Sequence, residues 1–387
     1  MNQADIKTLP AVCALISASG DPYVNLSFEE QLFEDTRPGH RRLLIYSNTP
    51  CVVMGKHQNP WIETDPDHLR ASGVPLLRRI SGGGTVYHDR GNLNYSFLVD
   101  GELFSKADNL ELVREVVAGL LRLRLPQGLP RAPVAGQYPV APSGTAGTAT
   151  GPGGTITAAP PAVTLSNYGD LLVDGAKVGG IALAHKGSSA ATSGSRGGSG
   201  MSRSRRSLHH GTVLVDADLS TLRDTLRRKP PPIVTHAVAS RPARVANLAE
   251  FWASGPSGAS VPSGASGPSG AMHSGEAAPS VDSLAWLLAD AFVRRYGGPK
   301  IEVDEHTAGA GTRDLVRRHR SREWLYGKTP KFTVYPPVDI SNGDSTMSLL
   351  VDRGIVQDAS DLPVPFGAMV GKYFDLSAFF HALEEAG

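Results

Sequence analysis

Residues 78–97 read RRISGGGTVYHDRGNLNYSF and hold the densest functional signal in the chain. The surrounding apolar runs predict strand, glycine turn, strand, tight turn and strand over 75–100, with a clear β run at 95–99. Three consecutive glycines let the backbone approach a ligand closely, and their N–H groups can form a nest for an anion. Arg78 and Arg79 add positive charge, so the stretch predicts a site for a phosphorylated or carboxylate group.

The same glycine stretch has a plainer interpretation, a glycine-rich turn beside surface arginines. Residue chemistry alone leaves both interpretations open. A P-loop is excluded because the pattern GxxxxGK[ST] is absent and no helix is predicted to follow. The stretch does not match the dinucleotide-binding fingerprint either.

Lys177 is a second candidate, in DGAKVGG at 174–180. The Asp174-Gly175 pair predicts the turn of a hairpin over 165–184. A strand lysine backed by two glycines can project between two anions and hold them together. The residue pattern alone favours an ordinary solvated strand lysine.

His209 and His210 precede an apolar strand. Adjacent strand residues face opposite sides, so the two imidazoles are not expected to share a metal ion. We expect a packing or hydrogen-bonding role for one of them.

Glycine and proline are abundant and unevenly distributed: the 387 residues include 43 Gly and 29 Pro. The excess lies in tracts near 127–162, 186–205 and 253–280. The first two lack hydrophobic periodicity and are predicted to be disordered insertions. The third repeats a GPSGAS-like hexapeptide with almost no apolar positions, so we expect a linker and not a solenoid.

Composition excludes several classes of protein. The net charge of +1 excludes a globally basic nucleic-acid binder, and the short arginine cluster at 202–207 is too small to predict RNA binding. No apolar run approaches the ~18 residues of a membrane span. Two cysteines, Cys13 and Cys51, cannot build a disulfide framework. We expect a soluble, intracellular protein with no evident targeting segment at its N-terminus.

Helices are predicted from apolar periodicity and capping residues. The first begins at Asn25 as N-cap, and a long one ends at Gly297 as C-cap. The predicted helices are 25–36, 68–74, 109–125, 218–228, 281–297 and 375–386. Further strands are predicted at 11–17, 43–55, 209–216, 332–335 and 345–356.

Five segments together resemble the lipoate–protein ligase and lipoyltransferase family. In chain order they are PCVVMGKHQNPW (50–61), RRISGGGTVYHDRGNLNYSF (78–97), DGAKVGG (174–180), HHGTVLVDADLSTL (209–222) and WLYGKTPKFTV (324–334). The resemblance implies an α+β fold, a mixed β-sheet flanked by helices as in biotin–protein ligases and class II synthetases. It spans most of the chain outside the low-complexity tracts.

From this resemblance and the tracts we expect three regions. Residues 1–252 would form the catalytic domain, interrupted by the insertions at 127–162 and 186–205. Residues 253–280 would be a linker, and 281–387 a small C-terminal α+β domain.

The resemblance implies that ATP and Mg²⁺ activate lipoate as lipoyl-adenylate, and that the lipoyl group then passes to a lysine of an acceptor. Lys177 would contact both the lipoate carboxylate and the α-phosphate. The residues implied for the nucleotide are Arg79, Gly84, Thr85, Val86, Tyr87 and Lys177. Those implied for lipoate are Ser81, Gly82, Gly83, His88 and Lys177.

The family also implies partners and a location. The acceptors would be the lipoyl domains of 2-oxo acid dehydrogenase E2 subunits and the glycine-cleavage carrier protein, with no nucleic acid or membrane involved. We expect a monomer. The implied location is mitochondrial, although no presequence is evident, and otherwise cytoplasmic.

Two departures from the family pattern keep alternatives open. Gly179 and Ile181 stand where the family has hydroxyl side chains. A lipoyl or octanoyl transferase without efficient adenylation, or a non-catalytic lipoyl-binding paralogue, are therefore alternatives. A cysteine thioester mechanism is disfavoured because no histidine is placed by sequence to activate Cys51. The sequence does not distinguish lipoate from octanoate.

Overall fold

The computed structural model describes residues 6–122, 160–187, 205–226, 231–253, 279–305, 309–336, 347–362 and 364–386. The low-complexity tracts lie almost wholly outside these residues, so their expected disorder stays a prediction. In the described part of the chain, no helix is long and apolar enough to cross a membrane.

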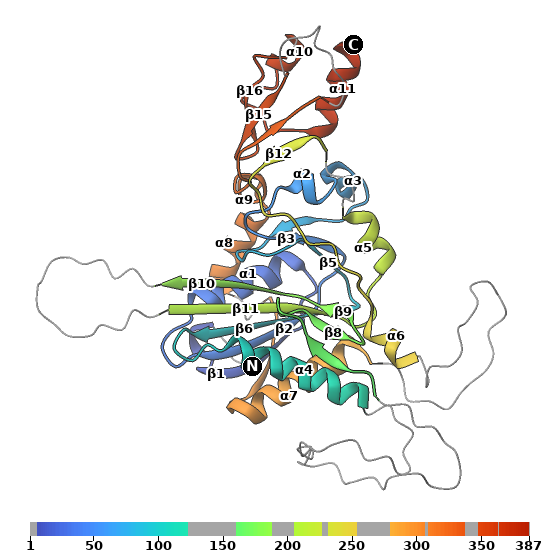
Figure 1. Ribbon diagram of the computed structural model, residues 1–387. Helices are drawn as coiled ribbons and strands as arrows, with labels where there is room; N and C mark the ends of the chain where they lie inside the picture. The colour runs from blue at the N-terminus through green and yellow to red at the C-terminus, as the bar shows by residue number, and fades with distance from the viewer. Residues whose placement is uncertain are drawn as a thin grey trace, which may run out of the picture.

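A six-stranded mixed sheet forms the centre of the larger part of the molecule (Figure 1), in the order β10-β11-β6-β2-β1-β13. β1 is parallel to both of its neighbours, and the other pairs are antiparallel. β6 is buried along its whole length, which places several polar side chains inside the protein. The strands are β1 (Val12–Ser17), β2 (Arg41–Tyr46), β6 (Asn92–Asp100), β10 (Ile181–Gly187), β11 (Arg205–Leu214) and β13 (Lys300–Val303).

Helices cover both faces of this sheet, as the predicted fold class requires (Figure 1). The helices are α1 (Pro22–Glu34) on one face, and α4 (Lys106–Arg122) and α7 (Val281–Tyr296) on the other. β2 supplies both cores, since successive strand residues face opposite sides. Leu43 and Ile45 join the core under α4 and α7, whereas Leu44 and Tyr46 join the core under α1.

Two three-stranded sheets carry the segments that the sequence analysis singled out. Their orders are β4-β3-β5 and β7-β8-β9. The predicted hairpin turn is confirmed: Asp174 and Gly175 have φ values of 46° and 81° between β8 and β9, as a type I′ turn requires. The strands are β3 (Cys51–Met54), β4 (Leu76–Arg78), β5 (Val86–His88), β7 (Val163–Leu165), β8 (Leu171–Val173) and β9 (Ala176–Gly179). The short elements nearby are η1 (Ile6–Thr8), α2 (Pro60–Glu63), α3 (Pro66–Ala71), α5 (Leu219–Thr225) and α6 (Leu248–Ala253).

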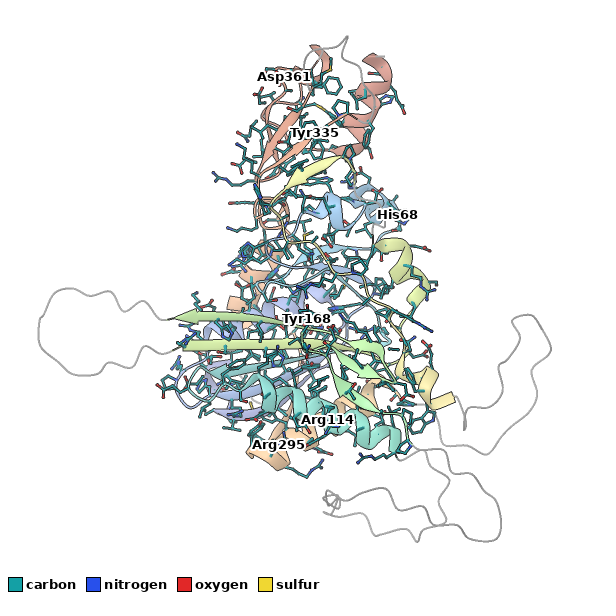
Figure 2. The ribbon with its side chains drawn as sticks, in the orientation of Figure 1. His68, Arg114, Tyr168, Arg295, Tyr335 and Asp361 are labelled. Carbon is teal, nitrogen blue, oxygen red and sulfur yellow. The ribbon has the colours of Figure 1, made fainter. Side chains whose placement is uncertain are left out.

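A smaller C-terminal part lies at one end of the molecule, where Figure 2 labels Tyr335 and Asp361. Its sheet has the order β12-β14-β15-β16. Its core contains Phe332, Phe366 and Phe379, and Trp61 from α2 packs into the same cluster. The elements are β12 (Ile233–Thr235), β14 (Phe332–Val334), β15 (Leu349–Asp352), β16 (Ile355–Asp358), α10 (Val364–Gly367) and α11 (Leu376–Ala386). α8 (Gly309–His319) and α9 (Arg322–Tyr326) connect it to the larger part.

The domain boundary differs from the one expected at residue 281. β13 pairs in parallel with β1, and α7 packs on the main core, so residues 281–303 complete the larger sheet. Conversely, β12 lies before the tract at 253–280 but pairs with β14 of the C-terminal sheet. The expected boundary rests on the change in composition along the chain. In the structure, however, the apolar faces of these elements pack against partners that lie far away in sequence.

Two local expectations in the N-terminal region are also corrected. The apolar run 43–55 forms two strands, β2 and β3, separated by residues 47–50. α1 begins earlier than predicted, with Asp21 as its N-cap. Asn25 is instead a buried residue inside the helix, bonded to Asn48 and to the carbonyl of Ser19.

Arg78, expected at the anion site, has a structural role instead. Its fully buried guanidinium donates to the carbonyls of Gly55, Lys56, Gln58 and Leu325, and to the Thr329 hydroxyl. Burial lowers the pKa of Arg78 to about 10. The side chain therefore joins β4 to the segment after α8.

Replacing Arg78 by methionine leaves these buried acceptors without their donor. We expect Arg78→Met to lower the free energy of unfolding by about 3 kcal/mol, measured by urea denaturation. The control is Arg70→Met, which removes an ion pair with Asp67 whose arginine side chain is 65% exposed. Its expected loss is below about 1 kcal/mol, and equal losses in the two variants would contradict the structural role of Arg78.

Candidate active site

A cavity with two adjoining lobes lies between the glycine turn, strands β9 to β11 and residues 236–245. The first lobe has a volume of about 360 Å³ and the second about 650 Å³. Both lobes share Thr85, Val86, Lys177, Gly180, Thr212 and residues 239–241. Two ligand groups placed in the two lobes would therefore meet beside Lys177.

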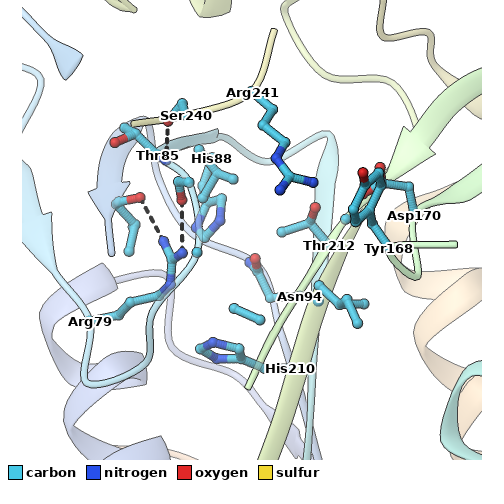
Figure 3. Close-up of a pocket in the computed structure, with 18 of the residues that line it drawn as sticks. Arg79, Thr85, His88, Asn94, Tyr168, Asp170, His210, Thr212, Ser240 and Arg241 are labelled. Carbon is cyan, nitrogen blue, oxygen red and sulfur yellow. Dashed lines mark hydrogen bonds between the residues drawn. The ribbon is translucent and has the colours of Figure 1, made fainter. Parts of the chain in front are cut away.

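Arg79 holds the glycine turn from beneath (Figure 3). Its Nε donates to Ser81 Oγ at 3.0 Å, and Nη2 donates to the carbonyls of Gly82 and Gly84 at 2.6 and 2.7 Å. Gly83 has φ +89°, and a Cβ there would lie 2.9 Å from Nη2, so only glycine fits. Burial lowers the pKa of Arg79 to about 10. Its charge faces the first lobe while its donors hold the shape of the turn.

A buried chain of polar groups continues from Ser81. Ser81 Oγ lies 2.6 Å from His210 Nε2, and His210 Nδ1 lies 2.9 Å from Glu29 Oε2. Glu29 also accepts hydrogen bonds from Ser96 and Tyr46. Burial acts to raise the pKa of Glu29, but His210 and Ser96 hold it below its usual value of 4.5. The carboxylate is therefore ionised and fixes the proton of His210 on Nδ1.

Serine, histidine and carboxylate in this order resemble the geometry of acyl-transfer triads. Ser81 is only 1% exposed, and it lies behind the residues that line the cavity. A substrate carbonyl in the cavity would not reach its hydroxyl. We therefore assign the arrangement to the support of the glycine turn.

His88 lies on the wall of the first lobe. Its Nδ1 is 3.0 Å from Asn48 Nδ2, while its Nε2 is buried without a hydrogen-bond partner among the described residues. Burial, with the nearby charge of Arg79, lowers the pKa of His88 to about 3. The imidazole is neutral at physiological pH.

Lys177 on β9 lies at the junction of the two lobes. Its Nζ is 2.8 Å from Asp170 Oδ1, and the lysine side chain is 27% exposed. A Cβ on Gly180 would lie 3.2 Å from Nζ, so this glycine leaves room for the lysine. Gly179 is equally constrained, because a Cβ there would lie 2.2 Å from the Thr212 carbonyl. The absence of a serine at 179 thus follows from close packing of β9 on β11.

Residues 236–245 form a strap over the cavity that sequence reasoning missed. Ser240 Oγ accepts from the Thr85 N–H at 2.8 Å and from Gln58, and it donates to Glu63. The N–H of Thr85, directly after the three glycines of the predicted anion nest, is thus satisfied within the chain. At the rim, the Arg241 guanidinium lies 4.2 Å from the Tyr168 ring centroid (Figure 3).

The structure brings most of the predicted site residues together. Those lining the first lobe are Arg79, Gly83, Gly84, Thr85, Val86, His88 and Lys177. Tyr87 lines the second lobe, with Thr85, Val86 and Lys177. Ser81 and Gly82 are not lining residues and belong to the turn behind.

The two histidines face opposite sides, as predicted. His209 packs against Phe97 and lies 3.3 Å from Asn109, on the α4 side of the sheet. His210 lines the first lobe, so it belongs to the site although the sequence suggested only packing or hydrogen bonding. Cys51 is fully buried, and burial raises its pKa well above the usual range. Such a thiol is a poor nucleophile, which agrees with the expectation that disfavours a cysteine thioester mechanism.

Comparisons with known proteins agree on one family. Residues 21–261 match the sequence model described as the lipoyl protein ligase A/B catalytic domain. A lipoate-protein ligase A from Psychrobacter cryohalolentis is 30% identical over 353 residues, which cover 89% of this chain and 80% of that protein.

Solved structures show a similar fold at low identity. P. falciparum LipL1 in complex with lipoate has a TM-score of 0.53 at 18% identity, covering 95% of this chain and 94% of that one. A bipartite lipoate protein ligase from Thermoplasma acidophilum, studied with its E2 lipoyl domain, has a TM-score of 0.50 at 18% identity. The match covers 81% of this chain and 95% of that one. This likeness supports the predicted mixed sheet flanked by helices.

Glu29 gives the site a pH-dependent contribution to stability. Because its pKa is lowered in the folded protein, the contribution is complete above the unfolded value of about 4.5 and is lost as the pH falls through the folded pKa. We expect Glu29→Gln to lower the free energy of unfolding by about 2 kcal/mol at pH 7, and by less at pH 3.5.

The matched control on the same helix is Glu34→Gln. Glu34 is 41% exposed and pairs with Lys186, so we expect a loss below about 1 kcal/mol at both pH values. Denaturant unfolding at the two pH values measures both variants. A Glu29→Gln deficit that is equal at pH 7 and pH 3.5 would contradict the ionised, hydrogen-bonded carboxylate.

Proposed function

The chain belongs to the lipoate–protein ligase family, and on that premise we propose that it activates lipoate with ATP and transfers the lipoyl group to a lysine of an acceptor protein. The matched family region is a catalytic domain, so the chain is an enzyme. The observation that carries the proposal is the position of Lys177, on the shared wall of two adjoining lobes.

The chemistry requires this placement of a cation. A carboxylate oxygen attacks the α-phosphorus, the bond to the departing pyrophosphate breaks, and a mixed anhydride forms between two groups that both begin as anions. The Lys177 ammonium lies between the lobes and offsets their repulsion. Holding both reactants in adjoining lobes removes most of the entropic barrier. The acceptor amine then attacks the acyl carbonyl, and AMP departs.

The residues that line the two lobes suit different parts of the substrates. The first lobe has apolar walls at Leu26, Val53 and Ile181, suited to an alkyl chain, and we name it the acyl lobe. The second lobe contains Leu222 and Leu226, suited to the faces of a purine, and we name it the nucleotide lobe. The family resemblance assigns Arg79 and residues 84–87 to the nucleotide. Thr85, Val86 and Tyr87 line the nucleotide lobe and keep that assignment in this proposal, whereas Arg79 and Gly84 line only the acyl lobe.

Thr212 supplies the hydroxyl that positions 179 and 181 lack. It lies on β11, directly beside β9, and it lines both lobes. The family pattern places hydroxyls after the lysine, where Gly179 has no room for a side chain. A hydroxyl at the same junction on the neighbouring strand favours the complete ligase over a transferase that lacks adenylation.

Mg²⁺ would enter with ATP and neutralise phosphate charge. No group of three histidine, cysteine or acidic side chains that could hold a metal occurs among the described residues. This fits an ion held largely by phosphate oxygens and water. Asp170, beside Lys177, is a carboxylate on the wall of the acyl lobe that could contribute.

The proposed acceptors are the lipoyl domains of 2-oxo acid dehydrogenase E2 subunits and the glycine-cleavage carrier protein. The archaeal relative studied with its E2 lipoyl domain supports the first. We further propose that the enzyme acts as a monomer, in mitochondria if its source is eukaryotic. Mass spectrometry of an acceptor incubated with enzyme, ATP, Mg²⁺ and lipoate tests the overall reaction.

Lipoate-dependent exchange of radiolabelled pyrophosphate into ATP tests the activation step. We expect exchange by the wild type and a loss of about 10²–10³-fold in Lys177→Met, because the charge stabilising the transition state is removed. Lys186→Met is the control, since Lys186 pairs with Glu34 on the surface. A wild type that shows no exchange, but transfers from preformed lipoyl-adenylate, would support the transferase alternative.

The Thr212 hydroxyl gives a second test of the same step. We expect Thr212→Val to lower the exchange rate about tenfold, because one hydrogen bond to the phosphate is lost, while Thr212→Ser retains most of it. Lipoate affinity measured by calorimetry without ATP should remain unchanged in both variants. Equal exchange rates for Thr212→Val and wild type would remove Thr212 from the phosphate site.

A further inference from the structure

The acyl lobe opens to solvent between the turn that joins β7 to β8 and the strap at 236–245. Tyr168 in that turn and Val238 in the strap both line the lobe, yet they are 66% and 52% exposed. A residue that lines a cavity and is also largely exposed lies at its opening. Arg241 is exposed as well and lines both lobes. We call Tyr168, Val238 and Arg241 the mouth of the cavity.

The mouth lies beside the junction of the two lobes. Tyr168 is two positions from Asp170, whose carboxylate oxygen lies 2.8 Å from Lys177 Nζ. On the side of the strap, the backbone N–H of Lys177 donates to the carbonyl of Arg244 at 3.2 Å. An acyl group activated beside Lys177 therefore lies just inside the mouth, where an amine entering from outside would meet it.

Exposed apolar side chains are concentrated at this opening. Among the described residues, the large apolar residues that are more than half exposed are Tyr168, Val234 and Val238, and two of these three belong to the mouth. A single exposed apolar side chain needs no explanation, but two that flank the opening of a catalytic cavity indicate contact with another protein. Tyrosine and arginine are also the side chains that contribute most to such contacts.

The strap carries positive charge and no negative charge. Its sequence, HAVASRPARV, contains two arginines and one histidine but no acidic residue. The Arg241 guanidinium lies 4.2 Å from the Tyr168 ring centroid (Figure 3), and neither Arg241 nor Arg244 pairs with a carboxylate in the part of the chain that the structure describes. Stacking on a ring leaves the N–H donors of a guanidinium free to bind a carboxylate. The mouth is thus complementary to a surface that is both acidic and apolar.

We propose that Tyr168, Val238 and Arg241 dock the acceptor protein, and that they recognise a protruding turn in which acidic and apolar side chains flank the target lysine. The proposal rests on the proposed function and names the surface that binds its protein substrate. A lysine has only a four-carbon stem, so the acceptor backbone must stop at the mouth while the amine reaches the acyl carbonyl. The neighbours of that lysine then meet the three mouth residues. Apolar contacts beside so few cations favour a protein over a nucleic acid, which is bound mainly through many phosphate contacts.

Separate measurement of the two half-reactions on the full chain tests this surface. Preformed lipoyl-adenylate is supplied, and the KM for a purified E2 lipoyl domain is measured by mass spectrometry of the lipoylated product. We expect Tyr168→Ser and Arg241→Gln each to raise this KM about tenfold with little change in kcat, because each removes one docking contact. Tyr168→Ser should leave lipoate-dependent pyrophosphate exchange unchanged, since exchange requires no acceptor.

Tyr373 and Arg322 provide matched controls. The Arg322 guanidinium lies 4.6 Å from the Tyr373 ring centroid, and Tyr373 is 37% exposed, but neither residue lines the cavity. We expect Tyr373→Ser and Arg322→Gln to keep the wild-type KM for the acceptor.

Ionic strength gives a second readout of the same surface. Salt screens charge pairs across an exposed interface, so the acceptor KM of the wild type should rise with salt, and it should rise less in Arg241→Gln.

Three results would overturn the proposal. The first is an unchanged acceptor KM in both mouth variants, and the second is an equal loss of exchange and transfer in Tyr168→Ser. The third is a wild type that sediments as a dimer while Tyr168→Ser is a monomer, because a second copy of the chain would then cover the mouth. Absence of pyrophosphate exchange in the wild type would instead count against the proposed function.

Discussion

The Arg79 guanidinium, buried beneath the glycine turn, is the contact on which the rest of the site depends. Through Ser81 it connects to His210 and Glu29 on the central sheet and α1. Through the carbonyls of Gly82 and Gly84 it sets the shape of the turn. A buried cation requires compensation, and the ionised Glu29 carboxylate supplies it within the same core. The neutral state of His88 follows from burial and from this nearby positive charge.

The polar residues of the site have two different roles, one structural and one chemical. Polar groups beneath the acyl lobe are bonded to one another and hold the wall rigid, whereas Lys177 and Thr212 lie where the two lobes meet. Preorganised charge at such a junction stabilises a transition state without rearrangement. The strap at 236–245 lines both lobes, and its Ser240 hydroxyl is bonded to the turn through the Thr85 N–H.

The sequence predicted the elements whose signals are local. The glycine turn, the Asp174-Gly175 hairpin and the opposite faces of the two histidines all depend on neighbouring residues. Glu29 lies in the helix predicted over 25–36, but its role is not visible there because its partner His210 lies 181 positions away. Ser240 lies in a stretch without periodicity, and its partners Glu63 and Thr85 are 177 and 155 positions away. Such long-range polar contacts leave no periodic pattern in the sequence. The predicted role of Arg78 and the predicted domain boundary at 281 are wrong for the same reason, because the contacts that decide them are also distant in sequence.

The central claim is that acyl group and nucleotide occupy adjoining lobes that meet at Lys177. A crystal structure with a non-hydrolysable lipoyl-adenylate analogue, in which a sulfamate replaces the phosphate, tests this most directly. The account predicts the dithiolane in the lobe lined by His88, the purine beside Leu222 and the sulfamate within hydrogen-bond distance of Lys177 Nζ. An analogue whose acyl chain lies in the lobe lined by Leu222, or whose sulfamate lies away from Lys177, would contradict it.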